Sequence, residues 1–137
     1  MKVAPILAEL HRHPAEFTPL FVHTGQHYDY QLSEVFAKAL ELPAPDAHLD
    51  VVRDNVAQQM ADIIAKFDRF LEERQPDLVM VVGDVTSTAA CALAAAQRFT
   101  PVAHVEAGLR SRDRTMPEEL NRLVADTLSD LLFTYSA

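Results

Sequence analysis

The sequence predicts an α/β fold in which helices cover both faces of a parallel sheet. Helix-like and strand-like segments alternate along the whole chain, which is typical of parallel strands joined by crossover helices. The segment 77–83 (DLVMVVG) is almost continuously apolar, as expected for a strand buried on both of its faces. The chain has 137 residues, 49% of them hydrophobic, which is enough for one domain but too few for two of ordinary size.

Apolar periodicity and chain-breaking residues define five elements in the first 76 residues. In order, they are a helix over 5–10, a strand over 18–24, a helix over 31–40, a strand over 48–52 and a helix from about 55 to 74. The first helix ends before Pro14, because a residue that precedes proline is pushed out of the helical region. The last helix has the clearest apolar stripe, and Asp54 or Asn55 would cap its first turn.

The remaining residues continue the same alternation. In order, we expect the strand over 77–83, an Ala-rich helix, a strand over 101–105, a helix over 117–130 and a strand over 131–135. Thr86, Ser87 or Thr88 would cap the Ala-rich helix, because Ser and Thr side chains accept hydrogen bonds from the amides of a first turn. Pro117 suits the first position of the following helix.

Charge, cysteine content and apolar run length exclude several classes of protein. The formal net charge is -8 and no run of Lys or Arg occurs, so a nucleic-acid-binding surface is not expected. Cys91 is the single cysteine; we expect it to be a small buried residue in a reducing compartment. No segment reaches the roughly 20 apolar residues of a membrane span, and no Cys/His cluster suggests a metal site. We therefore expect a cytoplasmic protein.

Two carboxylates should lie at the same edge of the predicted sheet. Asp84 follows one strand and Glu106 ends the next, and ligands of open parallel sheets bind beyond these carboxyl ends. Neighbouring carboxylates can have their pKa values pushed apart, so that one accepts a proton and another donates one. Glu118 is the third candidate catalytic residue.

Structural roles for these carboxylates remain open alternatives. Asp84 would also serve as the cap of the next helix, and Glu118 is an expected acidic residue in a first helical turn. Glu106 would alternatively pair with Arg110 or Arg122.

Other residues at strand ends are candidate ligand contacts. Thr86 and Ser87 offer hydroxyl groups and helix amides to an anion, with ordinary capping as the alternative. His27 follows a glycine turn, where it would donate to a ligand phosphate or simply be solvated. Gly83 and Gly108 belong to neither a GxGxxG nor a Walker-type loop.

Five motifs follow one another along the chain: TGQHYD at 24–29, VVGD at 81–84, HVEAGLRS at 104–111, DRTMPEELNR at 113–122 and DLLF at 130–133. In this order they resemble the non-hydrolysing UDP-N-acetylglucosamine 2-epimerases, and the resemblance runs from about Lys2 to Ala137. HVEAGLR followed by PEE is its most specific part. Val85 and Arg112 depart from the family pattern, in which Thr and Phe are common at these places.

The resemblance implies a Rossmann-like sheet, with residues 1–137 forming a partial N-terminal domain of a glycosyltransferase-B-type two-domain fold. It implies an isomerase of cell-surface polysaccharide biosynthesis that interconverts UDP-N-acetylglucosamine (UDP-GlcNAc) and UDP-N-acetylmannosamine (UDP-ManNAc). UDP is eliminated with loss of the C2 proton, and is then added back with protonation on the opposite face. No cofactor and no metal are implied.

The resemblance also implies roles for particular residues. Asp84, Glu106 and Glu118 match the essential acidic residues of the family. The remaining expected contacts to nucleotide sugar are Gln26, His27, Arg53, Thr86, Ser87 and Arg110. Of these, Gln26, His27 and Arg53 fall where some bacterial members bind a second, activating UDP-GlcNAc.

The first strand of the family, with its Gly-Thr-Arg-Pro-Glu loop, and the second domain have no counterpart in the sequence. In a doubly wound sheet that strand is central, so two neighbouring strands would lose hydrogen-bonding partners. We therefore expect an incomplete site and no epimerisation by this chain alone. The alternative is a non-catalytic nucleotide-sugar-binding or interaction half of a split enzyme, whose partner would be a second chain; a homodimer is also expected.

Overall fold

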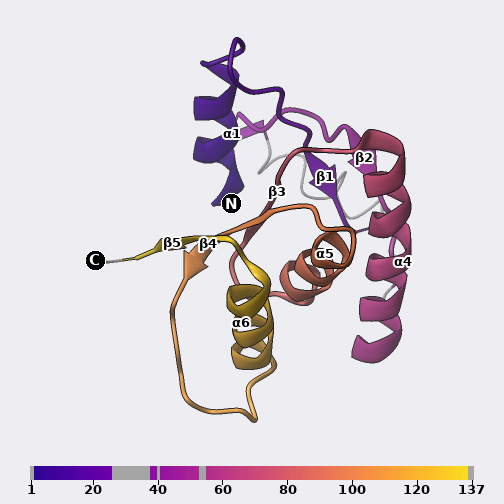
Figure 1. Ribbon diagram of the computed structural model, residues 1–137, viewed down its shortest axis with the longest axis vertical. Coiled ribbons are helices and arrows are strands. Elements are labelled where there is room, and N and C mark those ends of the chain that lie inside the picture. Colours follow the sequence, from indigo (N-terminus) through magenta and orange to yellow (C-terminus); the bar gives the residue numbers. More distant parts are fainter. Residues whose placement is uncertain (1, 26–37, 40, 53–54, 136–137) are drawn as a thin grey trace. The chain divides into compact units, whose positions relative to one another are not determined.

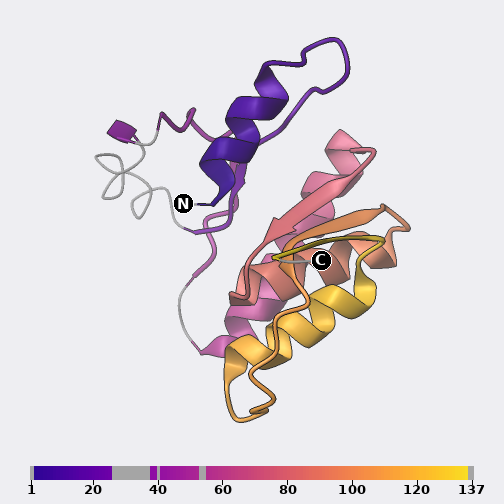
Figure 2. The same ribbon diagram turned by 90° about the vertical axis from the view of Figure 1, so that its left-hand side faces the viewer.

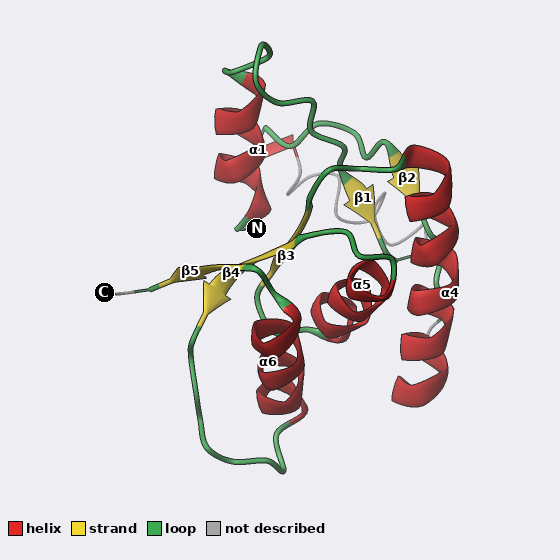
Figure 3. Cartoon of the chain, viewed as in Figure 1, coloured by secondary structure: helices red, strands yellow, loops and turns green. Residues whose placement is uncertain are grey.

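The chain forms two compact units, Met1–Val52 and Arg53–Ala137 (Figure 1). The computed structural model describes residues 2–25, 38–39, 41–52 and 55–135. Helices and parallel strands occur in both units (Figure 3), which confirms the predicted α/β class.

The first unit contains one helix and a small parallel sheet. Helix α1 (Val3–His11) buries Ala4 and Leu7, and its position confirms the helix predicted over 5–10. Strands β1 (Val22–His23) and β2 (Ala47–His48) pair in parallel, with His23 opposite His48. The strands predicted over 18–24 and 48–52 are thus much shorter than expected, and the helix predicted over 31–40 lies outside the described residues except at 38 and 39.

The second unit contains three helices and a three-stranded parallel sheet. Its elements are α4 (Val56–Arg74), β3 (Val79–Val82), α5 (Thr86–Gln97), β4 (Val102–Ala107), α6 (Pro117–Leu128) and β5 (Leu131–Thr134). The strand order is β3-β4-β5. Helix α5 packs against α4 and α6, and α5 and α6 lie side by side against the strands (Figure 2).

Small side chains make this packing close. Five alanines of α5 are 2% exposed or less, so the helix approaches its neighbours with little side-chain bulk between them. Ile63 and Phe67 of α4 are also buried. The first turn of α4 is capped as predicted, because Asn55 Oδ1 accepts a hydrogen bond of 2.9 Å from the amide of Gln58.

Two local predictions are wrong. The residue that precedes α5 is Val85, whose side chain makes no capping hydrogen bond, so Thr86, Ser87 and Thr88 lie within the first turn instead of capping it. Thr88 Oγ1 donates to the Val82 carbonyl at 3.0 Å and thereby ties the helix to the end of β3. β3 is buried on one face only, since Val79 and Val81 are buried while Met80 is 36% exposed.

No helix among the described residues is long and apolar enough to cross a membrane.

Candidate functional site

The carboxyl ends of β3 and β4 bring Asp84 and Glu106 to the same edge of the sheet. The strands are parallel and adjacent, and the Gly83 amide donates to the Val105 carbonyl at 3.0 Å. Gly83 has a φ of +79°, which suits glycine, and a Cβ built there would lie 3.8 Å from Glu106 Oε2. The Glu106 carboxylate therefore lies against the turn that carries Asp84.

Glu106 has an unusual backbone conformation. Its φ is +70°, in the left-handed region, and the pairing of β4 with β5 shifts register between Val105 and Ala107. Such a bulge redirects a side chain out of the regular alternation of a strand, and left-handed backbone at a residue other than glycine costs roughly 1 to 3 kcal/mol. Glu106 is also among the residues that line a shallow depression of about 290 Å³, together with Val105, Phe133, Thr134 and Tyr135.

Asp84 is held by two residues of α6. Its Oδ2 atom accepts a hydrogen bond of 3.0 Å from Arg122 Nη1, and its carbonyl accepts one of 2.9 Å from Asn121 Nδ2. Because Val85 occupies the capping position of α5, the alternative role of Asp84 as a helix cap does not apply. Arg122 pairs with Asp84 and Glu119, and Arg110 pairs with Asp126.

Glu119 is the buried glutamate of the PEE motif, at 2% exposure, whereas Glu118 is exposed in the first turn of α6. Its carboxylate accepts hydrogen bonds from the amides of Ser111 (2.9 Å) and Arg112 (3.1 Å) and from the Ser111 hydroxyl (3.1 Å). The Ser111 amide bond, together with the other donors and Arg122, holds the pKa of Glu119 below its ordinary value despite burial. Glu119 thus fixes the chain that follows β4.

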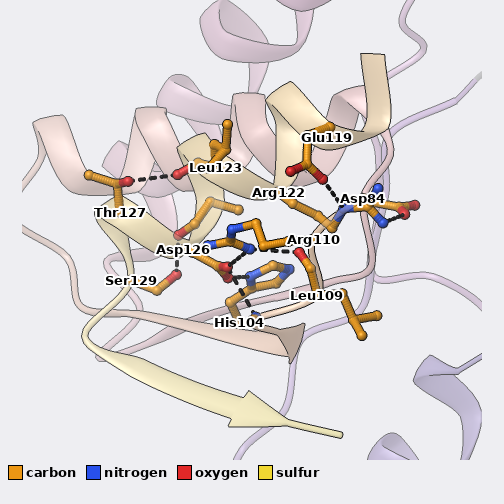
Figure 4. Close-up of polar contacts among 12 residues, drawn as sticks. Asp84, His104, Leu109, Arg110, Glu119, Arg122, Leu123, Asp126, Thr127 and Ser129 are labelled. Carbon is orange, nitrogen blue, oxygen red and sulfur yellow. Dashed lines mark hydrogen bonds and ion pairs between the residues drawn. The ribbon is translucent and has the colours of Figure 1, made fainter. Parts of the chain in front are cut away.

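His104 and Asp126 form a second buried group (Figure 4). The His104 side chain is fully buried; its Nδ1 lies 2.6 Å from Asp126 Oδ1 and its Nε2 lies 2.8 Å from the Gly83 carbonyl oxygen. The other oxygen of Asp126 accepts from the Gly108 amide (3.0 Å) and from Arg110 Nη1 (2.6 Å). Burial raises the pKa of Asp126, but the bonds from Arg110, Gly108 and His104 outweigh it and hold this pKa below the ordinary value.

Glu119, His104 and Asp126 belong to this site but were not singled out by the sequence patterns. A signal for two of them was present, because Glu119, Arg122 and Asp126 are spaced by three and four residues and so share one face of a helix. His104 gave no signal beyond its place in the HVEAGLR motif.

The remaining predicted contacts are distributed along the same edge or lie outside the described residues. Thr86 and Ser87 follow Asp84 in the first turn of α5, and Arg110 lies in the segment after β4, where it also donates to the Leu109 carbonyl. Gln26, His27 and Arg53 are outside the described residues. Within the part of the chain that the structure describes, no group of three or more His, Cys, Asp or Glu side chains is arranged to hold a metal ion.

Comparison with known proteins gives consistent matches. A family model described as UDP-N-acetylglucosamine 2-epimerase matches residues 8–137. A UDP-N-acetylglucosamine 2-epimerase homolog of Methanococcus maripaludis is 43% identical over 134 residues, covering 98% of this chain and 37% of the relative. The UDP-2,3-diacetamido-2,3-dideoxy-D-glucuronate 2-epimerase of Pseudomonas aeruginosa is 43% identical over 114 residues, covering 83% of this chain and 32% of that protein.

A solved structure has the same fold. The crystal structure of Methanocaldococcus jannaschii UDP-GlcNAc 2-epimerase in complex with UDP-GlcNAc and UDP superposes with a TM-score of 0.90 at 37% sequence identity, covering 97% of this chain and 36% of that one. The chain thus spans about a third of the length of the relatives it matches. On the family match and these identities, the chain belongs to the UDP-N-acetylglucosamine 2-epimerase family.

Proposed function

We propose that this chain supplies the catalytic carboxylates of a site that interconverts UDP-GlcNAc and UDP-ManNAc. The proposal includes the assignment of residues 1–137 to part of the N-terminal domain of a two-domain, cytoplasmic enzyme. It is supported by the family match and by the similar crystal structure of the Methanocaldococcus jannaschii enzyme in complex with UDP-GlcNAc and UDP. The catalytic carboxylates are those of Asp84, Glu106 and Glu118.

The reaction requires proton transfer at a carbon atom. A base removes the C2 proton while the bond between C1 and the UDP oxygen breaks, and UDP leaves with the electron pair to give 2-acetamidoglucal. UDP then adds back to C1, and an acid returns a proton to the other face of C2. One group must accept and another must donate, and carboxylates placed around one sugar ring meet that need.

The observation that carries the proposal is the strained backbone of Glu106. Among the described non-glycine residues with positive φ, Glu106 (φ +70°) is the one that lies inside a strand, and this conformation has an energetic cost. The carboxylate lies beside the Gly83 backbone, in the turn that carries Asp84. Arg122 pairs with Asp84 at 3.0 Å and so holds that carboxylate in place.

The other predicted contacts are assigned to the nucleotide sugar. Thr86 and Ser87 would present hydroxyl groups and amides at the start of α5 to the diphosphate, and Arg110 would contribute a positive charge at the edge. Gln26, His27 and Arg53 would contact a second, activating UDP-GlcNAc. A homodimer or a second chain is the proposed partner.

Titration calorimetry with UDP-GlcNAc and UDP tests the proposal. The purified chain should bind UDP-GlcNAc, and Glu106→Gln and Asp84→Asn should each weaken binding by at least tenfold, while Glu72→Gln on the exposed face of α4 should not. Equal affinities for UDP-GlcNAc in the wild-type chain, Glu106→Gln and Asp84→Asn would contradict the assignment of these two carboxylates. In a parallel assay, formation of UDP-ManNAc by this chain alone would show that the reaction needs less of the relatives' length than we propose.

A further inference from the structure

His104 connects three parts of the second unit through one buried ring. The residue belongs to β4, its Nδ1 atom faces Asp126 of α6, and its Nε2 atom faces the carbonyl of Gly83 at the end of β3. The ring is fully buried and therefore has no bulk water with which to exchange these partners. None of the three catalytic assignments uses this residue.

The partners of the ring determine its hydrogen-bonding state. A backbone carbonyl oxygen only accepts, so Nε2 must carry a proton to bond Gly83 at 2.8 Å. Asp126 is held in its charged form by Arg110 and the Gly108 amide, and a charged carboxylate also only accepts. Nδ1 must then carry a proton as well. The charged groups of the cluster are Asp126 from α6 and Arg110 from the segment after β4, while β3 contributes only the Gly83 carbonyl.

The same contacts place the ring next to the carboxyl ends of β3 and β4, where the proposed catalytic residues Asp84 and Glu106 lie. The Gly83 carbonyl belongs to the peptide group that leads into Asp84, and Glu106 Oε2 lies 3.8 Å from the position that a Cβ atom of Gly83 would occupy. The carboxylate that binds the ring also binds Gly108, two residues beyond Glu106. Rotation of the ring would therefore break its bonds to the Gly83 carbonyl and to Asp126 together.

We propose that His104 is a positioning residue that carries protons on both ring nitrogens and, by bridging Asp126 to the Gly83 carbonyl, sets the geometry between the Asp84 turn and Glu106. The purpose of this geometry rests on the proposed function. The protonation and the bridge themselves do not require a substrate, so they are measurable in the free chain.

Nitrogen NMR of the histidine rings tests the protonation directly. At pH 8 an exposed histidine is mostly neutral, because its ordinary pKa is about 6.5. The histidines of the urea-unfolded chain serve as the reference and should show one protonated and one bare ring nitrogen. His104, identified by the signals missing from His104→Gln, should show two protonated nitrogens that exchange slowly with water. A bare nitrogen on His104 at pH 8 would overturn the proposal.

Two variants separate the two bonds of the bridge. In His104→Asn the amide nitrogen reaches the position of Nδ1 and keeps the bond to Asp126, whereas in His104→Gln it reaches the position of Nε2 and keeps the bond to Gly83. Each variant should shift the backbone amide signals of Asp84 and Glu106 and weaken UDP-GlcNAc binding by about tenfold, since one hydrogen bond to a charged or buried partner is lost. Unchanged amide signals in both variants would contradict a positioning role.

A matched variant separates positioning from general loss of stability. Ile63→Val removes one methylene from a residue of α4 that is 2% exposed and lies in another element, so it should lower the melting temperature without changing UDP-GlcNAc affinity. If Ile63→Val weakens binding as much as the His104 variants do, the positioning role is wrong. If the wild-type chain binds no UDP-GlcNAc, the proposed function fails, while the ring protonation and the Asp84 and Glu106 signals still decide this inference.

Discussion

Glu119 and Asp126 lie seven residues apart on one face of α6, and both hold the segment that follows β4, but they act on different parts of it. Glu119 binds the backbone of Ser111 and Arg112, and through Arg122 it reaches the carboxylate of Asp84. Asp126 binds Gly108 nearer the strand, and through His104 it reaches the carbonyl of Gly83. The two carboxylates thus approach the same Gly83–Asp84 turn from opposite ends of one helix face.

The difference shows how two buried carboxylates of a helix can position a site without contacting a substrate themselves. The Glu119 end works through backbone amides and one arginine, whose charge does not change in the accessible pH range. The Asp126 end adds a histidine ring, the side chain whose ordinary pKa is closest to neutrality. Loss of a single side chain should therefore lower the free energy of unfolding most at the Asp126 end.

The largest effect is expected for Asp126→Ala. This change leaves the buried Nδ1 of His104 without its acceptor and also removes the bonds from the exposed Gly108 amide and Arg110, and breaking a buried pair from one side costs about 3 to 5 kcal/mol. Urea unfolding followed by far-ultraviolet circular dichroism measures the loss. Glu119→Gln, which keeps an acceptor oxygen for Ser111 and Arg112, should cost less; an equal or greater loss in Glu119→Gln would reverse the comparison.

Acid should destabilise the chain through both carboxylates. Their folded-state pKa values are lower than those of the unfolded chain, so their contribution is complete above an unfolded pKa of about 4 and disappears as pH falls through the lower folded values. The unfolding free energy should fall below pH 4 in the wild-type chain, and less steeply in Asp126→Asn and in Glu119→Gln. Identical acid profiles in wild-type and both variants would show that neither carboxylate is linked to folding.

Glu106→Gly should separate UDP-GlcNAc binding at this edge of the sheet from the stability of the chain. Glycine adopts a φ of +70° without the strain of a side chain, so the variant should be more stable by about 1 kcal/mol, while UDP-GlcNAc binding should be lost. Glu106→Gln is the control, since it removes the charge but keeps the strain, and its stability should stay near that of the wild-type chain. A less stable Glu106→Gly would mean that the side chain supports the fold and not the site.

The sequence predicts the parts of this structure that depend on local pattern. The stripe and cap of α4, the parallel strands at 79–82 and 102–107, and the meeting of Asp84 and Glu106 at one edge all follow from periodicity and from strand direction. The short β1 and β2 were overestimated, because a β-rich composition does not determine how many residues find a pairing partner.

The details of the site depend on contacts between distant residues. His104 and Asp126 are 22 residues apart, so their bond is invisible to any pattern within one element. Glu118 and Glu119 are chemically identical neighbours, and only the rotational phase of α6 decides which one is buried. The left-handed backbone of Glu106 was equally hidden, since a glutamate at a strand end has no intrinsic preference for it.

The smallest effect should be a change in the labelling rate of Cys91, which reports whether the two ends of α6 open equally. Burial in α5 raises the pKa of this thiol to about 12, so at pH 8 the folded wild-type chain should react with a thiol reagent only through opening. Because α5 packs against α6, loosening of α6 should expose the thiol more often. We expect faster labelling in Asp126→Asn than in Glu119→Gln, measured by mass spectrometry with urea-unfolded protein as the reference for the fully exposed thiol. Equal rates in both variants would mean that α6 opens as one piece, and that the difference between its two carboxylates is confined to the edge they position.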